Sequence, residues 1–181
     1  MTAPIRGRVW CVGDDIDTDL ILPIDVLQFP RLQRPQYMFR ANRPGWAAQV
    51  RPGDILVAGR NFGMGSGRPA ALAMRDLGLA AVLAESVNGL FFRNCVNYAL
   101  PVLAIVGIRA LFDEGDEAEI DFGNARVTHL RSGAVLCGAP WPEMLQASLR
   151  HGGLVEKLEA QGLLHPAGWT PQAEAGPGQT A

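Results

Sequence analysis

Three short apolar runs, at 55–58, 80–84 and 100–106, constrain the fold of this chain more than any other feature. Two segments with helical patterns, at 69–77 and 87–97, separate these runs. Short buried strands that alternate with helices are typical of an α/β domain. We therefore predict an α/β fold for this part of the chain.

The last third of the sequence has a different character. Strand-like segments at 117–122, 125–130 and 134–137 are separated by Gly-Asn and Ser-Gly turns, which predicts an antiparallel meander. Helices are expected at 142–149 and 154–161. The chain has 181 residues, enough for one domain with a core of its own.

The first third begins with a predicted strand at 7–12, followed by a polar loop and a short apolar run that ends at Pro23. A long segment at 28–53, rich in Pro, Arg and Gln, has the length of a functional excursion and is expected to hold a short helix near 46–50. We place the domain at 1–165 and predict that 166–181, rich in Pro, Gly, Ala and Gln, is a disordered tail.

The composition narrows the classes of partner and cofactor. The net charge of -2 does not suit nucleic acid or an anionic membrane, and no apolar run reaches the roughly 20 residues that span a bilayer. With no leader pattern at its start, the chain is expected in the cytoplasm. Its cysteines, Cys11, Cys95 and Cys137, are odd in number and widely spaced, so we expect neither a disulfide framework, nor a metal site, nor a cluster site in this chain.

The most informative local feature is a glycine-rich segment at 61–69, NFGMGSGRP, between a predicted strand and a predicted helix. Its glycines let the backbone approach a ligand closely, and Pro69 suits the first helical position. Arg68 offers a planar fork for a carboxylate or phosphate, beside the hydroxyl of Ser66. The segment has no P-loop lysine and does not match GxGxxG, so an anion site and a tight structural turn both remain open.

A second polar feature is the acidic segment at 14–19, DDIDTD. Four carboxylates in six residues resemble a calcium loop, but the glycine and the distal glutamate of an EF-hand are missing. Local chemistry favours a solvated loop that caps a helix or turn.

Taken together, these segments resemble the small subunits of the isopropylmalate dehydratase family, which are separate-chain versions of the aconitase swivelling domain. The resemblance covers roughly residues 6–162. It rests on the order and spacing of GRVW, GDDIDTD, LILP, PGDILVAG, NFG, FFRN, LPVL and GGL along the chain.

This resemblance implies a swivelling β/β/α domain and a large partner subunit that binds a 4Fe–4S cluster. It also implies a reaction that moves a hydroxyl between neighbouring carbons of a small carboxylic acid by dehydration and rehydration. Ser66 occupies the position of the family's catalytic base and Arg68 that of its substrate-binding arginine. Asp19 matches an active-site aspartate in the family's TD pair, with Thr18 beside it, and the resemblance implies that both bind substrate. Gly65 and Gly67 belong to the substrate loop, and the specificity loop corresponds to Val26, Leu27, Gln28 and Phe29.

The chain also departs from the family pattern GSSREHA. Gly67 replaces the second serine, Pro69 and Ala70 replace the Glu-His pair, and Gly89 stands where an arginine is usual. The leading hypothesis is therefore an active small subunit that works on a substituted malate, most simply in isopropylmalate isomerisation for leucine synthesis. A paralogue for another acid (alkylmalate, citraconate or maleate, homoaconitate) and a non-catalytic swivelling domain remain alternatives. A nucleotide-phosphate site in an unrelated α/β enzyme is the most distant one.

Overall fold

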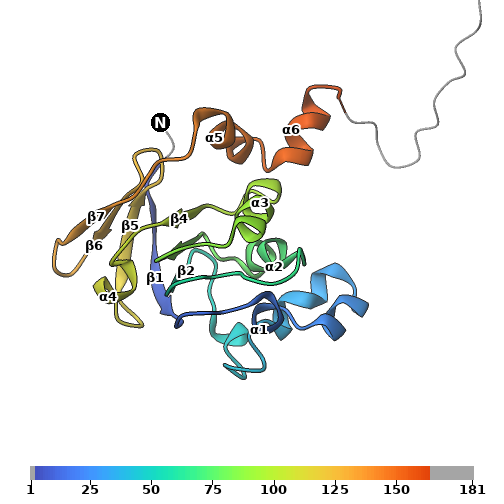
Figure 1. Ribbon diagram of the computed structural model, residues 1–181, viewed down its shortest axis with the longest axis horizontal. Coiled ribbons are helices and arrows are strands. Elements are labelled where there is room, and N and C mark those ends of the chain that lie inside the picture. The colour runs from blue at the N-terminus through green and yellow to red at the C-terminus, as the bar shows by residue number, and fades with distance from the viewer. Residues whose placement is uncertain (1–2, 164–181) are drawn as a thin grey trace, which may run out of the picture.

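The computed structural model describes residues 3–163, and a single seven-stranded sheet runs through them (Figure 1). The strand order is β4-β3-β2-β1-β5-β6-β7. Strands β1 to β4 pair in parallel, whereas β1, β5, β6 and β7 pair antiparallel. The strands are β1 Ile5–Cys11, β2 Ile55–Ala58, β3 Ala81–Ala84, β4 Val102–Ala104, β5 Glu117–Asp121, β6 Arg126–His129 and β7 Val135–Cys137.

Helices cover the parallel half of the sheet. In Figure 1, α2 and α3 lie together on one side of it, and α4 lies on the opposite side, where it contacts β2 and β3. The helices are α1 Thr18–Ile21, α2 Ala70–Leu77, α3 Gly89–Asn97, α4 Ile108–Leu111, α5 Glu143–Arg150 and α6 Leu154–Ala160. Three 3₁₀ turns complete the excursion: η1 Ile24–Gln28, η2 Arg31–Tyr37 and η3 Ala47–Gln49.

The predicted α/β class and the antiparallel meander are both confirmed. The first helical position of α2 was predicted wrongly: Pro69 is the residue before the helix, with ψ of 47°, and α2 begins at Ala70. The short helix expected near 46–50 is present as η3, and the segment at 28–53 also holds η2, which was not expected. The short helices α1 and α4 were not expected. The predicted tail at 166–181 lies outside the described residues.

The core covers the strands that form at two of the three apolar runs, whereas the third was predicted too long: β4 is only Val102–Ala104, and Val106 is 85 % exposed. Every residue of β2 and β3 is buried, because both faces of a parallel sheet are covered by other elements. The rings of Phe62 and Phe91 meet edge to face at 5.2 Å between centroids and join the loop after β2 to α3. Among residues 3–163, no helix is long and apolar enough to cross a bilayer.

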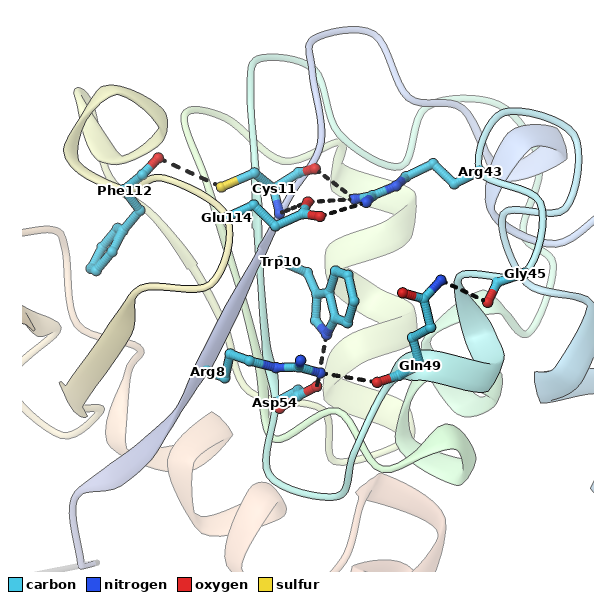
Figure 2. Close-up of polar contacts among 9 residues, drawn as sticks. All are labelled: Arg8, Trp10, Cys11, Arg43, Gly45, Gln49, Asp54, Phe112 and Glu114. Atoms are coloured by element: carbon cyan, nitrogen blue, oxygen red, sulfur yellow. Dashed lines mark hydrogen bonds and ion pairs between the residues drawn. The ribbon is translucent and has the colours of Figure 1, made fainter.

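The excursion between α1 and β2 is fastened to the first strand through Trp10. Figure 2 shows its indole between the guanidinium groups of Arg8 and Arg43, whose Cζ atoms lie 4.5 and 5.4 Å from the ring centroid. Arg43 donates to the Cys11 carbonyl at 3.0 Å and binds both carboxylate oxygens of Glu114 at 2.7 and 2.8 Å. Arg43 therefore fixes the excursion to the end of β1 and to the loop before β5.

Asp54, in the turn before β2, binds Arg8 and Trp10 of β1. Its carboxylate is 4 % exposed and accepts hydrogen bonds from Arg8 and from the Trp10 indole N–H, both at 2.7 Å, and from the Arg51 backbone N–H at 3.0 Å. Burial alone would raise the pKa of Asp54. The hydrogen bonds and the charge of Arg8 outweigh burial, so that the net pKa lies below its usual value.

We expect Asp54→Asn to lower the free energy of unfolding by roughly 1–3 kcal/mol at pH 7, because it removes a charged hydrogen-bond acceptor. The stability that a carboxylate with a lowered pKa contributes is present above its unfolded value of about 3.9 and is lost as the pH falls through the folded pKa. The difference between wild type and variant should therefore shrink at low pH. Urea unfolding at pH 7 and at about pH 3 measures it.

Asp25→Asn is the matched control, because Asp25 is an exposed carboxylate paired with Arg40. It should change stability little, since exposed ion pairs contribute little. A pH-independent difference for Asp54→Asn would contradict the role given to its charge.

Candidate active site

The glycine-rich segment and the acidic segment meet at the carboxyl ends of β1 and β2. The Gly63 N–H donates to the Ile16 carbonyl, and the Thr18 N–H donates to the Met64 carbonyl, each at 2.8 Å. These bonds place the two loops side by side like short parallel strands. Ligands of open α/β sheets bind at this edge, so both predicted functional segments lie where the fold favours a site.

The loop after β3 is the third segment that borders the site. The Phe62 N–H donates to the Ser86 carbonyl at 3.0 Å, and the Phe62 carbonyl accepts from the Asn88 N–H at 2.8 Å. The Asn88 side chain then caps α3 by accepting from the Leu90 N–H at 3.0 Å. Three loops that are far apart in the sequence are thus joined by main-chain hydrogen bonds, which hold their geometry before any ligand binds.

Gly63 is the residue that lets these loops come so close. Its φ is +76°, and a Cβ atom there would lie 2.3 Å from the ring of Phe91. A larger residue would have to displace a fully buried aromatic ring that packs on Phe62. The first glycine of the segment is therefore required by packing.

Ser66 lies on the exposed part of the loop, and the buried Thr18 beneath it binds its backbone. The Ser66 N–H donates to the Thr18 hydroxyl at 3.0 Å, and the two hydroxyl oxygens are 3.4 Å apart. Thr18 itself is 1 % exposed, whereas Ser66 is open to solvent. The structure therefore brings together two predicted site residues that are 48 positions apart in the sequence.

Arg68 reaches the same place from the end of the loop. Its Nη1 group donates to the Asp19 carboxylate and to the Leu22 carbonyl, the latter at 3.2 Å. Its side chain is only 11 % exposed, while that of Asp19 is 60 % exposed. Within residues 3–163, Nε and Nη2 of Arg68 have no recorded partner, so one edge of the guanidinium remains for a ligand carboxylate.

The other two glycines of the loop differ in how tightly they are enclosed. Gly65 has φ of +99°, and a Cβ atom there would approach the Thr18 hydroxyl oxygen to 3.0 Å. At Gly67 a Cβ atom would meet only Leu90, at an ordinary 3.7 Å. The serine that relatives were expected to carry at this position would fit, so its absence is a chemical difference and not a packing requirement.

The predicted specificity loop lies in η1 and at its end. Val26 is wholly buried, which leaves its side chain no open face, and Phe29 stacks on Tyr37 with 4.9 Å between ring centroids. Gln28 is exposed, and Leu27 is partly buried. Ile24, which no sequence pattern indicated, is 65 % exposed and stands two residues after the Leu22 carbonyl that binds Arg68.

The arginines that follow this loop are already engaged. Arg31 forms a two-pronged ion pair with Asp76 of α2, with both distances 2.8 Å. Arg34 donates to the Leu27 carbonyl at 2.9 Å and to the Phe29 carbonyl at 3.0 Å. Arg34 thus shapes the loop from within, and neither guanidinium is directed at a ligand.

The described residues do not form a metal centre. Within residues 3–163, no three His, Cys, Asp or Glu side chains gather closely enough to hold a metal ion. Cys95 is buried in the core, where burial raises the pKa of its thiol well above the usual value. Thiolates are the ligands that iron–sulfur clusters need, so these residues do not fit such a group.

Comparison with known proteins gives consistent matches. Residues 32–106 match the family model of the aconitase C-terminal domain. The chain is 38% identical over 161 residues to the isopropylmalate/citramalate isomerase small subunit of Methanocaldococcus jannaschii, covering 88% of this chain and 96% of that one. It is 40% identical over 157 residues to the methanogen homoaconitase small subunit of Methanothermobacter thermautotrophicus, covering 86% and 91%.

A solved structure agrees with these matches. The crystal structure of a 3-isopropylmalate dehydratase from Methanocaldococcus jannaschii superposes with a TM-score of 0.83 at 29% identity, covering 89% of this chain and 96% of that one. Ser66 and Arg68 lie inside the matched family segment, whereas Thr18 and Asp19 lie before it.

Proposed function

This chain belongs to the family of 3-isopropylmalate dehydratase small subunits in the aconitase superfamily, and we propose that it supplies one half of the active site of a two-subunit hydro-lyase. The observation that carries the proposal is the meeting of Ser66 and Arg68 with Thr18 and Asp19 on one open edge of the sheet. An exposed half-site of this kind suits a partner subunit that closes over it. We place the assembled enzyme in the cytoplasm.

In this proposal Arg68 binds a substrate carboxylate through its open edge. Asp19 holds the guanidinium in place. The guanidinium lies between the Asp19 carboxylate and the substrate carboxylate, which would otherwise repel each other. As a proton leaves the carbon next to that carboxylate, negative charge develops there, and a prepositioned arginine stabilises it. Arg68 therefore both orients the acid and favours the removal of its proton.

Ser66 is the proposed base. Its deprotonated Oγ accepts the proton from the carbon and becomes a neutral hydroxyl, while the substrate hydroxyl leaves the neighbouring carbon as hydroxide and a carbon–carbon double bond forms. Rehydration then adds hydroxide to the carbon that lost the proton, and Ser66 gives its proton to the other alkene carbon, which restores the deprotonated serine. The exposed position of Ser66 lets a substrate held against the partner subunit reach its hydroxyl.

The iron–sulfur cluster of this proposal belongs to the large subunit, since the described residues of this chain offer no ligand set for it. Nothing in the chemistry of Ser66 and Arg68 depends on a metal ligand in this chain. The partner is accordingly a cluster-binding dehydratase subunit.

We propose a dicarboxylic substrate with an apolar or small substituent, that is, a substituted malate. A third carboxylate buried without a cation would be costly, and Arg31 and Arg34 are both committed elsewhere. Leu90 instead offers exposed apolar surface beside Gly67, and Ile24 is an exposed apolar residue two positions after the Leu22 carbonyl that binds Arg68. Because one relative is a homoaconitase small subunit, a tricarboxylate is the competing substrate class.

The reconstituted two-subunit enzyme is expected to prefer isopropylmalate or a small alkylmalate over homocitrate and citrate, as measured by kcat/KM with each acid and its alkene. Arg31→Ala and Arg34→Ala should leave this preference unchanged. The small subunit alone, purified anaerobically, is the control and should contain no iron and turn over none of these acids. A preference for tricarboxylic acids that disappears in either arginine variant would overturn the substrate assignment.

A further inference from the structure

The hydroxyl of Thr18 can form more hydrogen bonds than its neighbours in the structure supply. A threonine hydroxyl can accept two hydrogen bonds and donate one. The Ser66 N–H, at 3.0 Å, takes one acceptor position. Of the polar atoms in residues 3–163, Ser66 Oγ, at 3.4 Å, is the only other recorded partner of this oxygen.

Burial fixes the position of the Thr18 hydroxyl. Thr18 is 1 % exposed, and its backbone is held by the bond from its N–H to the Met64 carbonyl at 2.8 Å. Gly65 passes so close that a Cβ atom there would lie 3.0 Å from the hydroxyl oxygen. The Thr18 side chain therefore faces the underside of the loop, and the 3.4 Å contact between the two hydroxyl oxygens allows either one to donate to the other.

We propose that Thr18 is a positioning residue for Ser66. Its hydroxyl fixes the serine backbone by accepting the Ser66 N–H, and donates its own proton to Ser66 Oγ. This inference rests on the proposed function, because it assigns Thr18 a role in the proton transfer carried out by Ser66.

The chemical benefit lies in the deprotonated form of the serine. A donor aimed at an oxygen that becomes negatively charged stabilises the charged form more than the neutral one. The distance of 3.4 Å leaves room for the bond to shorten as charge develops, which is common for catalytic hydrogen bonds in the absence of substrate. Thr18 thus lowers the cost of using an ordinary serine as a base without touching the substrate.

The test compares Thr18→Val, which keeps the shape and removes the hydroxyl, with Thr18→Ser, which keeps the hydroxyl. In the assembled enzyme, Thr18→Val is expected to lower kcat by about 10- to 100-fold, as for the loss of a hydrogen bond to a charged group. KM should stay within a few-fold, and the acidic limb of the kcat profile should move to higher pH. Thr18→Ser should restore most of the activity. Thr128→Val on β6 is the matched control and should have no effect.

A double variant separates this role from a structural one. Because Thr18 acts through Ser66, Thr18→Val should cost little further activity in a Ser66→Ala background. Folding of Thr18→Val is expected, since the Ser66 N–H that it leaves unpaired is at an exposed residue that water can reach. Circular dichroism and the assembly state of the complex check this.

The outcomes also distinguish this inference from the proposed function. If Ser66→Ala lowers kcat strongly while Thr18→Val does not, or if the two effects multiply, the role of Thr18 is overturned and Ser66 keeps its own. If Ser66→Ala turns over normally, the proposed function itself fails, whatever Thr18→Val does.

Discussion

Replacing Ser66 by alanine is expected to lower kcat of the assembled enzyme by about 100- to 10,000-fold, because a positioned base contributes a factor of this size. Arg68 would still bind the substrate carboxylate, so KM should change little. Ser66 is exposed and its side chain contacts only the Thr18 hydroxyl among recorded partners in residues 3–163, so folding should be unaffected. Steady-state kinetics with size-exclusion chromatography of the complex measures both quantities.

Ser86→Ala is the matched control for this variant. The Ser86 hydroxyl lies in the same group of loops and accepts the Asn61 N–H at 2.8 Å, but it has no recorded contact with Ser66. We expect at most a few-fold change in kcat from its loss. Turnover of Ser66→Ala within tenfold of wild type would refute the assignment of the base.

Replacing Arg68 by lysine should lower kcat/KM by about 100- to 1,000-fold, the range seen when a donor that stabilises developing charge is removed. An ammonium group cannot bind Asp19 and the Leu22 carbonyl and also present a planar edge to a carboxylate. Both kcat and KM should suffer, since the same group orients the substrate and stabilises the transition state. Kinetics of the reconstituted enzyme with thermal unfolding of the small subunit separates this effect from misfolding.

Arg60→Lys is the matched control for Arg68→Lys. Arg60 pairs with Asp14 at the rim of the same loops, its side chain is 76 % exposed, and the exchange should leave kcat/KM near wild type. Asp19→Asn should lie in between, because it keeps Arg68 but loosens its hold. An Arg68→Lys enzyme as active as Arg60→Lys would exclude the carboxylate role.

Much of the fold could be predicted because buried apolar runs mark the parallel strands and glycine-containing turns mark the antiparallel ones, although β4 covers only 102–104 of the run at 100–106. The runs at 55–58 and 80–84 became β2 and β3, and the turns at 123–124 and 132–133 separate β5 from β6 and β6 from β7. The short helices α1 and α4 could not be predicted, since four residues are too few to show a helical period.

The way the two halves of the sheet join was also beyond sequence patterns. Strand β1 pairs in parallel with β2 through Val9 and Ile55 and antiparallel with β5 through Ile5 and Ile120, and no local pattern reports such distant partners. The contact between Thr18 and Ser66 depends on this arrangement. The residue types of the site were recognised from the resemblance, while the hydrogen bond that connects them required the structure.

The attachment of the excursion to Trp10 also affects how this protein can evolve. A segment whose two ends are fixed, by the main chain of α1 on one side and by Arg43 and Asp54 on the other, can be lengthened or shortened between them. Loop-closure entropy rises only slowly with length, by about 0.6 kcal/mol for each doubling. The stretch between Pro30 and Tyr37 is not free to vary in this way, because Arg31 binds Asp76 of α2 and Arg34 holds the carbonyls of Leu27 and Phe29. New acids can instead be recruited by substitutions at exposed residues such as Ile24 and Gln28, while the sheet, Ser66 and Arg68 stay in place.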